Sequence, residues 1–335
     1  AKNTAVGKSA LATLTTGNQN TCIGESALLL ATTGYDNVAM GFCAAYNVTT
    51  GNSNVALGES ALFTATTGFQ NVAIGHLALN KYTGSANVAV GNQALEDATT
   101  GNNNTCVGHD CGREITTATD NTAIGFNALS SNVTGADNTC VGQSAGQNIT
   151  GYRNTCVGNL AGDSITSGYR NTMIGDIAGE VLTTGNDNTC IGYNAQAAAV
   201  DSTNSFTFGD SNISVIRCNT TSISSLSDVR DKTDIVDLPL GVDFLNKLRP
   251  VKFKWERRTP DKNDGKIRAG FIAQELQVAQ SDCKYVDLVL EDNPDKLEAT
   301  PGNLIPVLVN AVKELSTKND ELAAEIATLK SQINN

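Results

Sequence analysis

The sequence has few of the residues on which catalytic, metal-binding and membrane-spanning functions commonly depend. It contains two histidines, His76 and His109, and a single tryptophan. No apolar run approaches the roughly 20 residues needed to span a bilayer. So little histidine nearly excludes a histidine-based catalytic triad or a His-rich zinc site. We therefore expect no metal, no cofactor and no membrane insertion.

Proline and basic residues are scarce before residue 227. All six prolines lie between Pro239 and Pro306, and residues 1–226 carry 7 basic and 15 acidic side chains, against 16 and 19 from Ser227 onward. This acidic balance disfavours nucleic acid and anionic membranes as partners. The nine cysteines are an odd number, which argues against a complete disulfide framework and fits a reducing cytoplasm. No basic and apolar leader opens the chain, so we expect no signal peptide in it.

What the sequence has instead is a short repeat. The pattern Asn-(Thr/Val)-(Ala/Cys/Met)-aliphatic-Gly recurs every 17 residues, with two steps of 16, and a degraded copy at 204–209 closes the series. This period suits one coil of a parallel β-solenoid per copy, with coils rising about 4.8 Å each. Glycine permits tight corners, and the asparagine is expected to stack as a buried ladder. The copies begin at Asn3, Asn20, Asn37, Asn54, Asn71, Asn87, Asn104, Asn121, Asn138, Asn154, Asn171 and Asn188.

Both faces of each repeat strand are suited to burial. In Asn-Val-Ala-Ile-Gly at 71–75 the three middle residues are all apolar. One face can fill the interior of the coil, so the other needs a partner, which a three-fold axis supplies; the pattern also admits a dimer. The repeats resemble the head repeats of trimeric autotransporter adhesins, and this resemblance implies a trimeric β-roll architecture but no ligand.

Three residue types within the repeats have both a functional and a structural interpretation. Cysteine at the third position could form a metal or redox column, but a small buried hydrophobe is favoured. Aspartate before the strand could bind calcium, but turn formation is favoured. Threonine pairs such as Thr32-Thr33 could bind ice or sugar, but they adjoin glycine corners and are interpreted as turns. The cysteines are Cys22, Cys106, Cys140, Cys156 and Cys190, and the aspartates are Asp36, Asp120, Asp137 and Asp187.

From Ile223 onward the pattern becomes that of a small α+β domain. We divide the chain into a shaft (1–210), a connector (211–226), a chaperone domain (227–303) and a C-terminal coiled-coil helix (304–335). The domain is expected to contain helices over 242–248 and 272–278, strands over 250–257 and 267–271, and a strand over 285–290. A polar loop over 259–266 joins the first two strands.

The last stretch has a heptad period, which predicts a parallel coiled coil. The d positions are leucines and the a positions are mostly β-branched, with Asn319 expected to fix register and oligomer state. By itself this pattern favours two strands somewhat over three, so the trimer depends on the shaft and on family resemblance. The trimerisation seam consists of Leu308, Val312, Leu315, Asn319, Leu322, Ile326, Leu329 and Ile333.

Three ordered motifs precede the coiled coil. They read Ser-Asp-x-Arg-x-Lys-x-x-Ile at 227–235, Leu-Arg-Pro-Val-Lys-Phe-Lys-Trp at 248–255 and Gly-Phe-Ile-Ala-Gln-Glu at 270–275. They resemble the endosialidase-type C-terminal intramolecular chaperone family, which caps phage tail spikes, fibres and neck appendages and also occurs in a membrane-tethered transcription factor. The resemblance implies a domain that trimerises, nucleates folding of the upstream fibre and then releases itself. Its motif residues here are Asp228, Arg230, Gly270, Phe271, Gln274 and Glu275.

Ser227 and Lys232 fall on the family's serine–lysine dyad. The implied activity is a single-turnover autocatalytic serine endopeptidase that cuts beside Ser227, within Leu226-Ser227-Asp228. A lysine can act as general base when burial or a nearby cation keeps it neutral. The alternative is structural, because Ser-Asp before a charged stretch is also an ordinary turn or helix cap.

These features together predict a homotrimeric phage tail fibre, spike or appendage, assembled in the host cytoplasm and carried on the virion. Its expected partners are itself, other tail proteins and a host-surface receptor or glycan. One alternative is a cell-surface adhesin or structural filament with an uncleaved chaperone tip. Another is a threonine-array solenoid that binds ice or glycan, which a mid-strand threonine grid would favour. A glycan-cleaving enzyme is disfavoured, since no recurrent carboxylate pair or aromatic platform is evident.

Overall fold

The computed structural model describes residues 2–210, 212–213, 216, 227–256, 265–295 and 297–333. The chain divides into two compact units, residues 1–213 and residues 214–335, which are described separately. None of the helices in these described ranges combines the length and apolar character that a membrane crossing requires.

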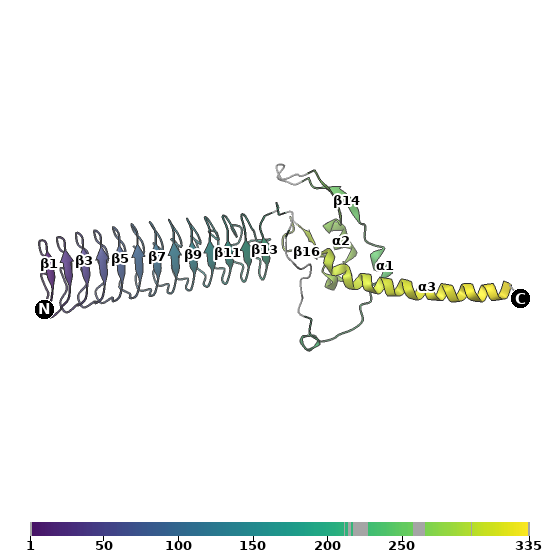
Figure 1. The fold of residues 1–335 in the computed structure, drawn as a ribbon, viewed down its shortest axis with the longest axis horizontal. Coiled ribbons are helices and arrows are strands. Elements are labelled where there is room, and N and C mark those ends of the chain that lie inside the picture. Colours follow the sequence, from purple (N-terminus) through teal and green to yellow (C-terminus); the bar gives the residue numbers. More distant parts are fainter. Residues whose placement is uncertain are drawn as a thin grey trace. The chain divides into compact units, whose positions relative to one another are not determined.

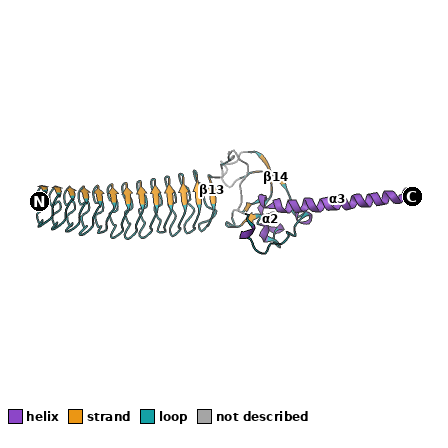
Figure 2. Ribbon diagram, turned by 60° about the horizontal axis from the view of Figure 1, so that its bottom comes forward, coloured by secondary structure: helices purple, strands orange, loops and turns teal. Residues whose placement is uncertain are grey.

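The first unit is a parallel β-solenoid, as the repeat predicts. Thirteen three-residue strands pair in sequence order, all parallel and in register, and they form a single row in Figure 1. Figure 2 shows that the strands line one side of the solenoid and the turns the other. The strands are β1 (Thr4–Val6), β2 (Thr21–Ile23), β3 (Val38–Met40), β4 (Val55–Leu57), β5 (Val72–Ile74), β6 (Val88–Val90), β7 (Thr105–Val107), β8 (Thr122–Ile124), β9 (Thr139–Val141), β10 (Thr155–Val157), β11 (Thr172–Ile174), β12 (Thr189–Ile191) and β13 (Phe206–Phe208).

Each strand from β2 to β12 buries its middle side chain and turns the other two outward, because side chains alternate along a strand. The middle positions are alanine, cysteine or methionine, and they join leucines and isoleucines from the turns in one continuous core. The five repeat cysteines are fully buried and unpaired, which agrees with their interpretation as small hydrophobes. Burial raises the pKa of the Cys22 and Cys190 thiols to about 11.

The repeat asparagines form the predicted ladder. The backbone N–H and side-chain amide of Asn37 both donate to Oδ1 of Asn20, at 3.0 and 3.1 Å. The same amide also donates to the Gly51 carbonyl at 2.9 Å. Each asparagine therefore satisfies polar groups of two neighbouring coils in a fully buried position, where unpaired groups would be costly.

Most coils have one glycine after the strand and another at the turn, and these two are needed for different reasons. Gly24 ends β2 with a φ of 137°, a conformation that side chains disfavour, and a Cβ there would lie 2.4 Å from the Gly41 carbonyl oxygen. Gly34, at the turn, has no left-handed φ, but a Cβ would lie 2.6 Å from the Gly51 oxygen. Asp36 adopts a left-handed φ of 57°, which supports the turn interpretation of the pre-strand aspartates.

The second unit is a small α+β region that ends in a long helix. Its core is formed by Phe244, Leu276, Leu288, Leu304 and Val307. Strands β14 and β15 pair antiparallel, as do β16 and β17. The elements are a 3-10 helix (Val229–Asp231), α1 (Val242–Leu245), β14 (Val251–Lys254), β15 (Ile267–Gly270), α2 (Ala273–Ala279), a 3-10 helix (Lys284–Val286), β16 (Val289–Leu290), β17 (Glu298–Ala299), a 3-10 helix (Pro301–Leu304) and α3 (Ile305–Ile333).

The strand predicted over 285–290 is largely wrong. Its first residues form a 3-10 helix, and Asp287 has a left-handed φ of 52°, so strand β16 begins only at Val289. Helix α1 is also shorter than predicted and ends at Leu245. The end of the strand predicted over 250–257 and most of the loop predicted over 259–266 lie outside the described residues.

Only the first turns of α3 belong to the core of this unit. Val307 and Ala311 are buried, and the Asn310 amide donates to the Leu238 carbonyl at 2.8 Å. The Glu314 carboxylate accepts from the Val242 backbone N–H at 2.9 Å. The predicted seam faces solvent in this single chain over its whole length, from Leu308 to Ile333. An apolar heptad seam of this kind is the surface through which helices pack in coiled coils.

Candidate self-cleavage site

A short turn brings the two predicted catalytic side chains together. Asp228 caps the 3-10 helix Val229–Asp231, because its Oδ1 accepts from the Arg230 backbone N–H at 2.9 Å. The helix ends at Lys232, whose backbone N–H donates to the Val229 carbonyl. The chain thereby folds back, and Lys232 Nζ donates to Ser227 Oγ at 2.5 Å.

The side chain of Arg230 closes the same turn. Its guanidinium makes a forked ion pair with Asp228, with Nε–Oδ distances of 3.0 and 3.1 Å and an Nη2–Oδ2 distance of 2.6 Å. This guanidinium holds the pKa of the Asp228 carboxyl below its usual value. Asp228 and Arg230 thus hold the turn that presents Lys232 to Ser227, so the geometry of the pair is local to residues 227–232.

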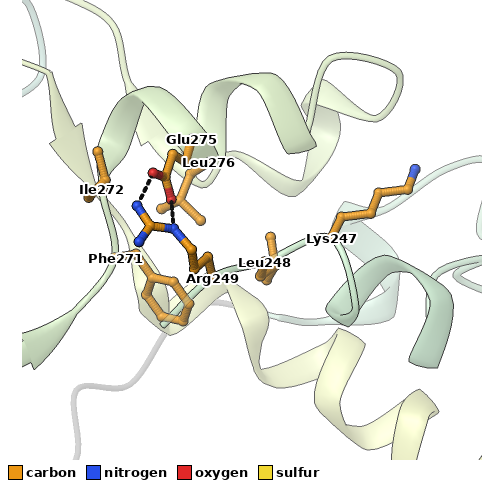
Figure 3. A pocket seen from close by; sticks show the side chains of 7 residues that line it. All are labelled: Lys247, Leu248, Arg249, Phe271, Ile272, Glu275 and Leu276. Atoms are coloured by element: carbon orange, nitrogen blue, oxygen red, sulfur yellow. Dashed lines mark hydrogen bonds and ion pairs between the residues drawn. The ribbon is translucent and has the colours of Figure 1, made fainter. Parts of the chain in front are cut away.

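The other two motifs meet at a second ion pair. Arg249 precedes β14, and Glu275 lies in the first turn of α2, which follows β15. Pairing of β14 with β15 brings them together, and Arg249 donates to both carboxylate oxygens of Glu275, with Nε at 3.0 Å (Figure 3). This guanidinium lowers the pKa of Glu275. The predicted site residues included Glu275 but not Arg249, although the motif at 248–255 contains it.

The remaining motif residues support this second pair. Gly270 ends β15, where a Cβ would lie 3.2 Å from the Phe253 ring, so a side chain there would crowd the strand pair. Phe271 is half-buried and packs against the core below Arg249 (Figure 3). Gln274 is exposed and lines an open groove beside Arg249. Within the described ranges, no hydrogen bond or ion pair joins residues 227–232 to the Arg249–Glu275 pair.

The turn holds a serine hydroxyl and a lysine amine in hydrogen-bond contact, the two groups from which a serine–lysine acyl-transfer site would be built. Both Ser227 and Lys232 are exposed in the single chain. The predicted scissile carbonyl, that of Leu226, lies outside the described residues. Nothing within the described part of this chain covers the lysine, so a desolvated dyad would need further groups around it.

The C-terminal segment matches a known family. The family model described as chaperone of endosialidase matches residues 227–285, which contain all three motifs and both ion pairs. The resemblance predicted from these motifs is therefore confirmed for this segment. No curated protein and no solved structure was found to match the chain, so the resemblance of the repeats to adhesin heads stays a prediction.

The shaft carries a threonine column that the sequence analysis did not single out. Threonine occupies the first position of every strand from β7 to β12, and these residues pair directly, as Thr122 does with Thr139. Among the described residues, the hydroxyls of this column have no hydrogen-bond partner. The corner threonines differ, since Thr99 Oγ1 donates to the Thr116 carbonyl of the next coil at 2.9 Å. Corner hydroxyls thus stabilise the coils, whereas the strand hydroxyls are available to solvent or a partner.

A stacked tyrosine pair also lies on the shaft. The rings of Tyr152 and Tyr169 are parallel, with centroids 4.9 Å apart, and Arg153 and Arg170 each lie over one of these rings. Arg170 is itself paired with Asp187 at 2.9 Å. The two rings therefore contact each other and the neighbouring arginines, and Tyr152 stays 44% exposed.

Proposed function

We propose that the chain is a homotrimeric tail fibre, spike or appendage protein of a phage-like particle, with a C-terminal unit that guides assembly and then cuts itself free beside Ser227. The observation that carries the proposal is the hydrogen bond between Lys232 and Ser227 inside the segment that matches the chaperone family. The solenoid supports it further, since a repeat shaft joined to this domain fits a tail-spike-like protein. Its partners would be two more copies, other tail proteins and a host-surface receptor or glycan.

The proposed reaction is an acyl transfer to Ser227. Ser227 Oγ attacks the Leu226 carbonyl carbon while its proton passes to Lys232 Nζ. The bond from that carbon to the Ser227 nitrogen breaks, and Lys232 returns the proton to the nitrogen. Water then hydrolyses the resulting ester and regenerates the hydroxyl, which frees residues 227–335. A cut on the other side of Ser227 would free residues 228–335 instead.

Assembly is proposed to complete this site. A lysine acts as a base only in its neutral form, which water does not favour at neutral pH. Both dyad residues are exposed in one chain, so the covering groups must come from other chains or from the upstream segment. Cleavage would then follow trimer formation and would not compete with it.

The shaft has a physical need for such a chaperone. Parallel pairing of non-local strands is slow and leaves folding intermediates open to aggregation. The coils are nearly identical, so a slip by one whole coil costs little locally. Joining three chains at the C-terminus sets the register and raises the effective concentration of the strands. Removal of the domain afterwards would leave a kinetically trapped shaft.

Intact mass under denaturing conditions tests the proposal. The wild-type chain should yield a fragment whose mass corresponds to residues 227–335 or 228–335, and Ser227→Ala should remain full length. Lys232→Met should also remain full length, whereas the neighbouring Ser225→Ala should be cut like wild type. A full-length wild type, with the trimer intact, would remove the peptidase assignment and leave a permanent assembly tip.

One observation favours a second function, the threonine-array solenoid that binds ice or glycan. The column on β7–β12 occupies the first position of each strand, in register and without internal hydrogen bonds among the described residues. Such a surface can bind a ligand only if it remains open to solvent. Its exposure in the assembled protein therefore decides between this function and burial of the strands.

A further inference from the structure

The outward side chains of the strands form one uncharged surface along the shaft. We define the strip as the first and third residues of every strand from β1 to β13. These residues are threonine, valine, isoleucine, leucine or methionine in β1–β12, and Phe206 and Phe208 in β13; none is charged and none is an amide. Several are well exposed in the single chain, among them Val6 at 57% and Ile124 at 42%.

Mostly polar columns border the strip on both sides, and the column after the repeat glycine also contains the exposed rings of Phe42, Phe126 and Tyr193. After the repeat glycine, Lys8 pairs with Glu25 of the next coil at 3.3 Å. Before the repeat asparagine, Arg170 pairs with Asp187 of the next coil at 2.9 Å. Charge is therefore tolerated on neighbouring positions of the same coils but absent from the strip. An apolar band with a polar rim is the usual anatomy of a protein interface.

The length and period of the strip restrict what can cover it. It continues over thirteen strands with a spacing of about 4.8 Å per strand. A globular partner would cover a few coils, whereas another copy of this shaft, parallel and in the same register, matches every coil. The exposed heptad seam of α3 would deliver such copies in parallel orientation.

The residue types on the strip also suit a symmetric contact. A rotation axis brings each residue near its own counterparts in other copies, so charged side chains would repel one another there. Aliphatic side chains pack well against their like, and a threonine hydroxyl can both donate to and accept from another. The strip contains these self-complementary types, with valine in the first position of β3–β6 and threonine in that of β7–β12.

We propose that the strip is the surface of the shaft that packs against the strips of two other copies of the chain. This inference rests on the proposed homotrimer and adds which face of the solenoid lies at the axis. It places the stacked tyrosines and the corner threonines outside the contact between the three shafts. It also removes the strand threonines from contact with external ligands.

Cysteine accessibility in the full-length protein tests this assignment. Ile124→Cys places a thiol on the strip, and Val133→Cys places one on a turn of the same coil at a position of similar exposure, 42% against 40%. Maleimide labelling of the native protein should be lost for Ile124→Cys and rapid for Val133→Cys. Mild oxidation should cross-link two chains in Ile124→Cys and not in Val133→Cys. The unsubstituted chain gives the background of native thiols, and Thr122→Cys repeats the strip measurement.

Sedimentation of the same samples separates the possible failures. If the chain is trimeric but Ile124→Cys and Thr122→Cys react as fast as Val133→Cys, the strip is open and the inference is overturned, while the homotrimer stands. Arrest of ice growth by such a trimer would assign the strip to the threonine-array function. If the folded chain is monomeric, the inference and the proposed homotrimer both fail.

Discussion

Asn121 shows what one buried side chain contributes to the shaft. Its amide donates to the Gly135 carbonyl at 2.9 Å, and its Oδ1 accepts from the Asn138 backbone N–H at 2.9 Å. Asn121→Ala removes the hydrogen-bond partner of the Gly135 carbonyl and of the Asn138 backbone N–H. Both groups then stay buried and unpaired, away from water. We expect a loss of roughly 2–4 kcal/mol of shaft stability, measured as a lower midpoint of thermal unfolding.

The matched control for this prediction is Asn148→Ala. Asn148 is exposed on a turn, and its amide donates to the Asp163 carbonyl at 2.8 Å, so water can replace that bond. Its loss should cost less than about 1 kcal/mol. If the two variants lower the unfolding midpoint equally, the ladder does not satisfy the buried polar groups of the coils.

The elements of the shaft could be predicted from the sequence far better than those of the C-terminal unit. Each repeat places the same types of side chain at the same step, so spacing alone predicts the coil, the asparagine ladder and the burial of the residue that lies in the middle of each strand. The small unit has one copy of each element and depends on tertiary contacts. The left-handed backbone of Asp287 delays the predicted strand to Val289, and the Arg249–Glu275 pair depends on the pairing of β14 with β15.

The dyad shows the limits of prediction for the candidate site. The spacing of Ser227 and Lys232 predicts that they act together, and the turn that joins them uses only neighbouring residues. Their catalytic role stays a prediction, because the groups that would desolvate them do not come from the described part of this chain. The column of strand threonines was not predicted, because the sequence analysis considered only the threonine pairs at the corners. The alternation of buried and outward side chains along each strand identifies the column.

The Arg249–Glu275 pair links the start of β14 to α2. The effect of removing this pair on the stability of the C-terminal unit should depend on pH. Because Arg249 lowers the folded-state pKa of Glu275, the stabilisation is present above the ordinary value of 4.5 and is lost as pH falls through the lowered value. We expect Glu275→Gln to lower the unfolding midpoint of the C-terminal unit slightly at pH 7. The difference from wild type should fade below about pH 4.5.

A control on α3 separates this effect from general charge. Glu321→Gln removes the same charge from a position outside the seam, and among the described residues Glu321 has no ion-pair partner. It should leave the unfolding midpoint nearly unchanged at both pH values. A constant difference between Glu275→Gln and wild type at every pH would contradict the ion-pair explanation.

Assembly of the whole molecule is expected to begin at α3. The seam is exposed along α3 from Leu308 to Ile333, whereas the near-identical coils of the shaft differ little between one register and the next. Leu322→Asp would bring three like charges together in the seam and should prevent trimerisation. Because the strip of each shaft would then lack its partners, we expect most of the chain to aggregate, measured as soluble trimer by sedimentation.

Thr328→Asp adds the same charge on the solvent side of α3, and it should assemble as wild type does. Comparing the two variants therefore isolates the seam from the net charge of the chain. If Leu322→Asp still yields soluble trimers with a cooperative unfolding transition, the shaft selects its own register and the C-terminal unit is dispensable for assembly. If it yields soluble monomers with folded shafts, the strip is stable without partners, and exposure of the threonine column to an external ligand becomes the better account of the solenoid.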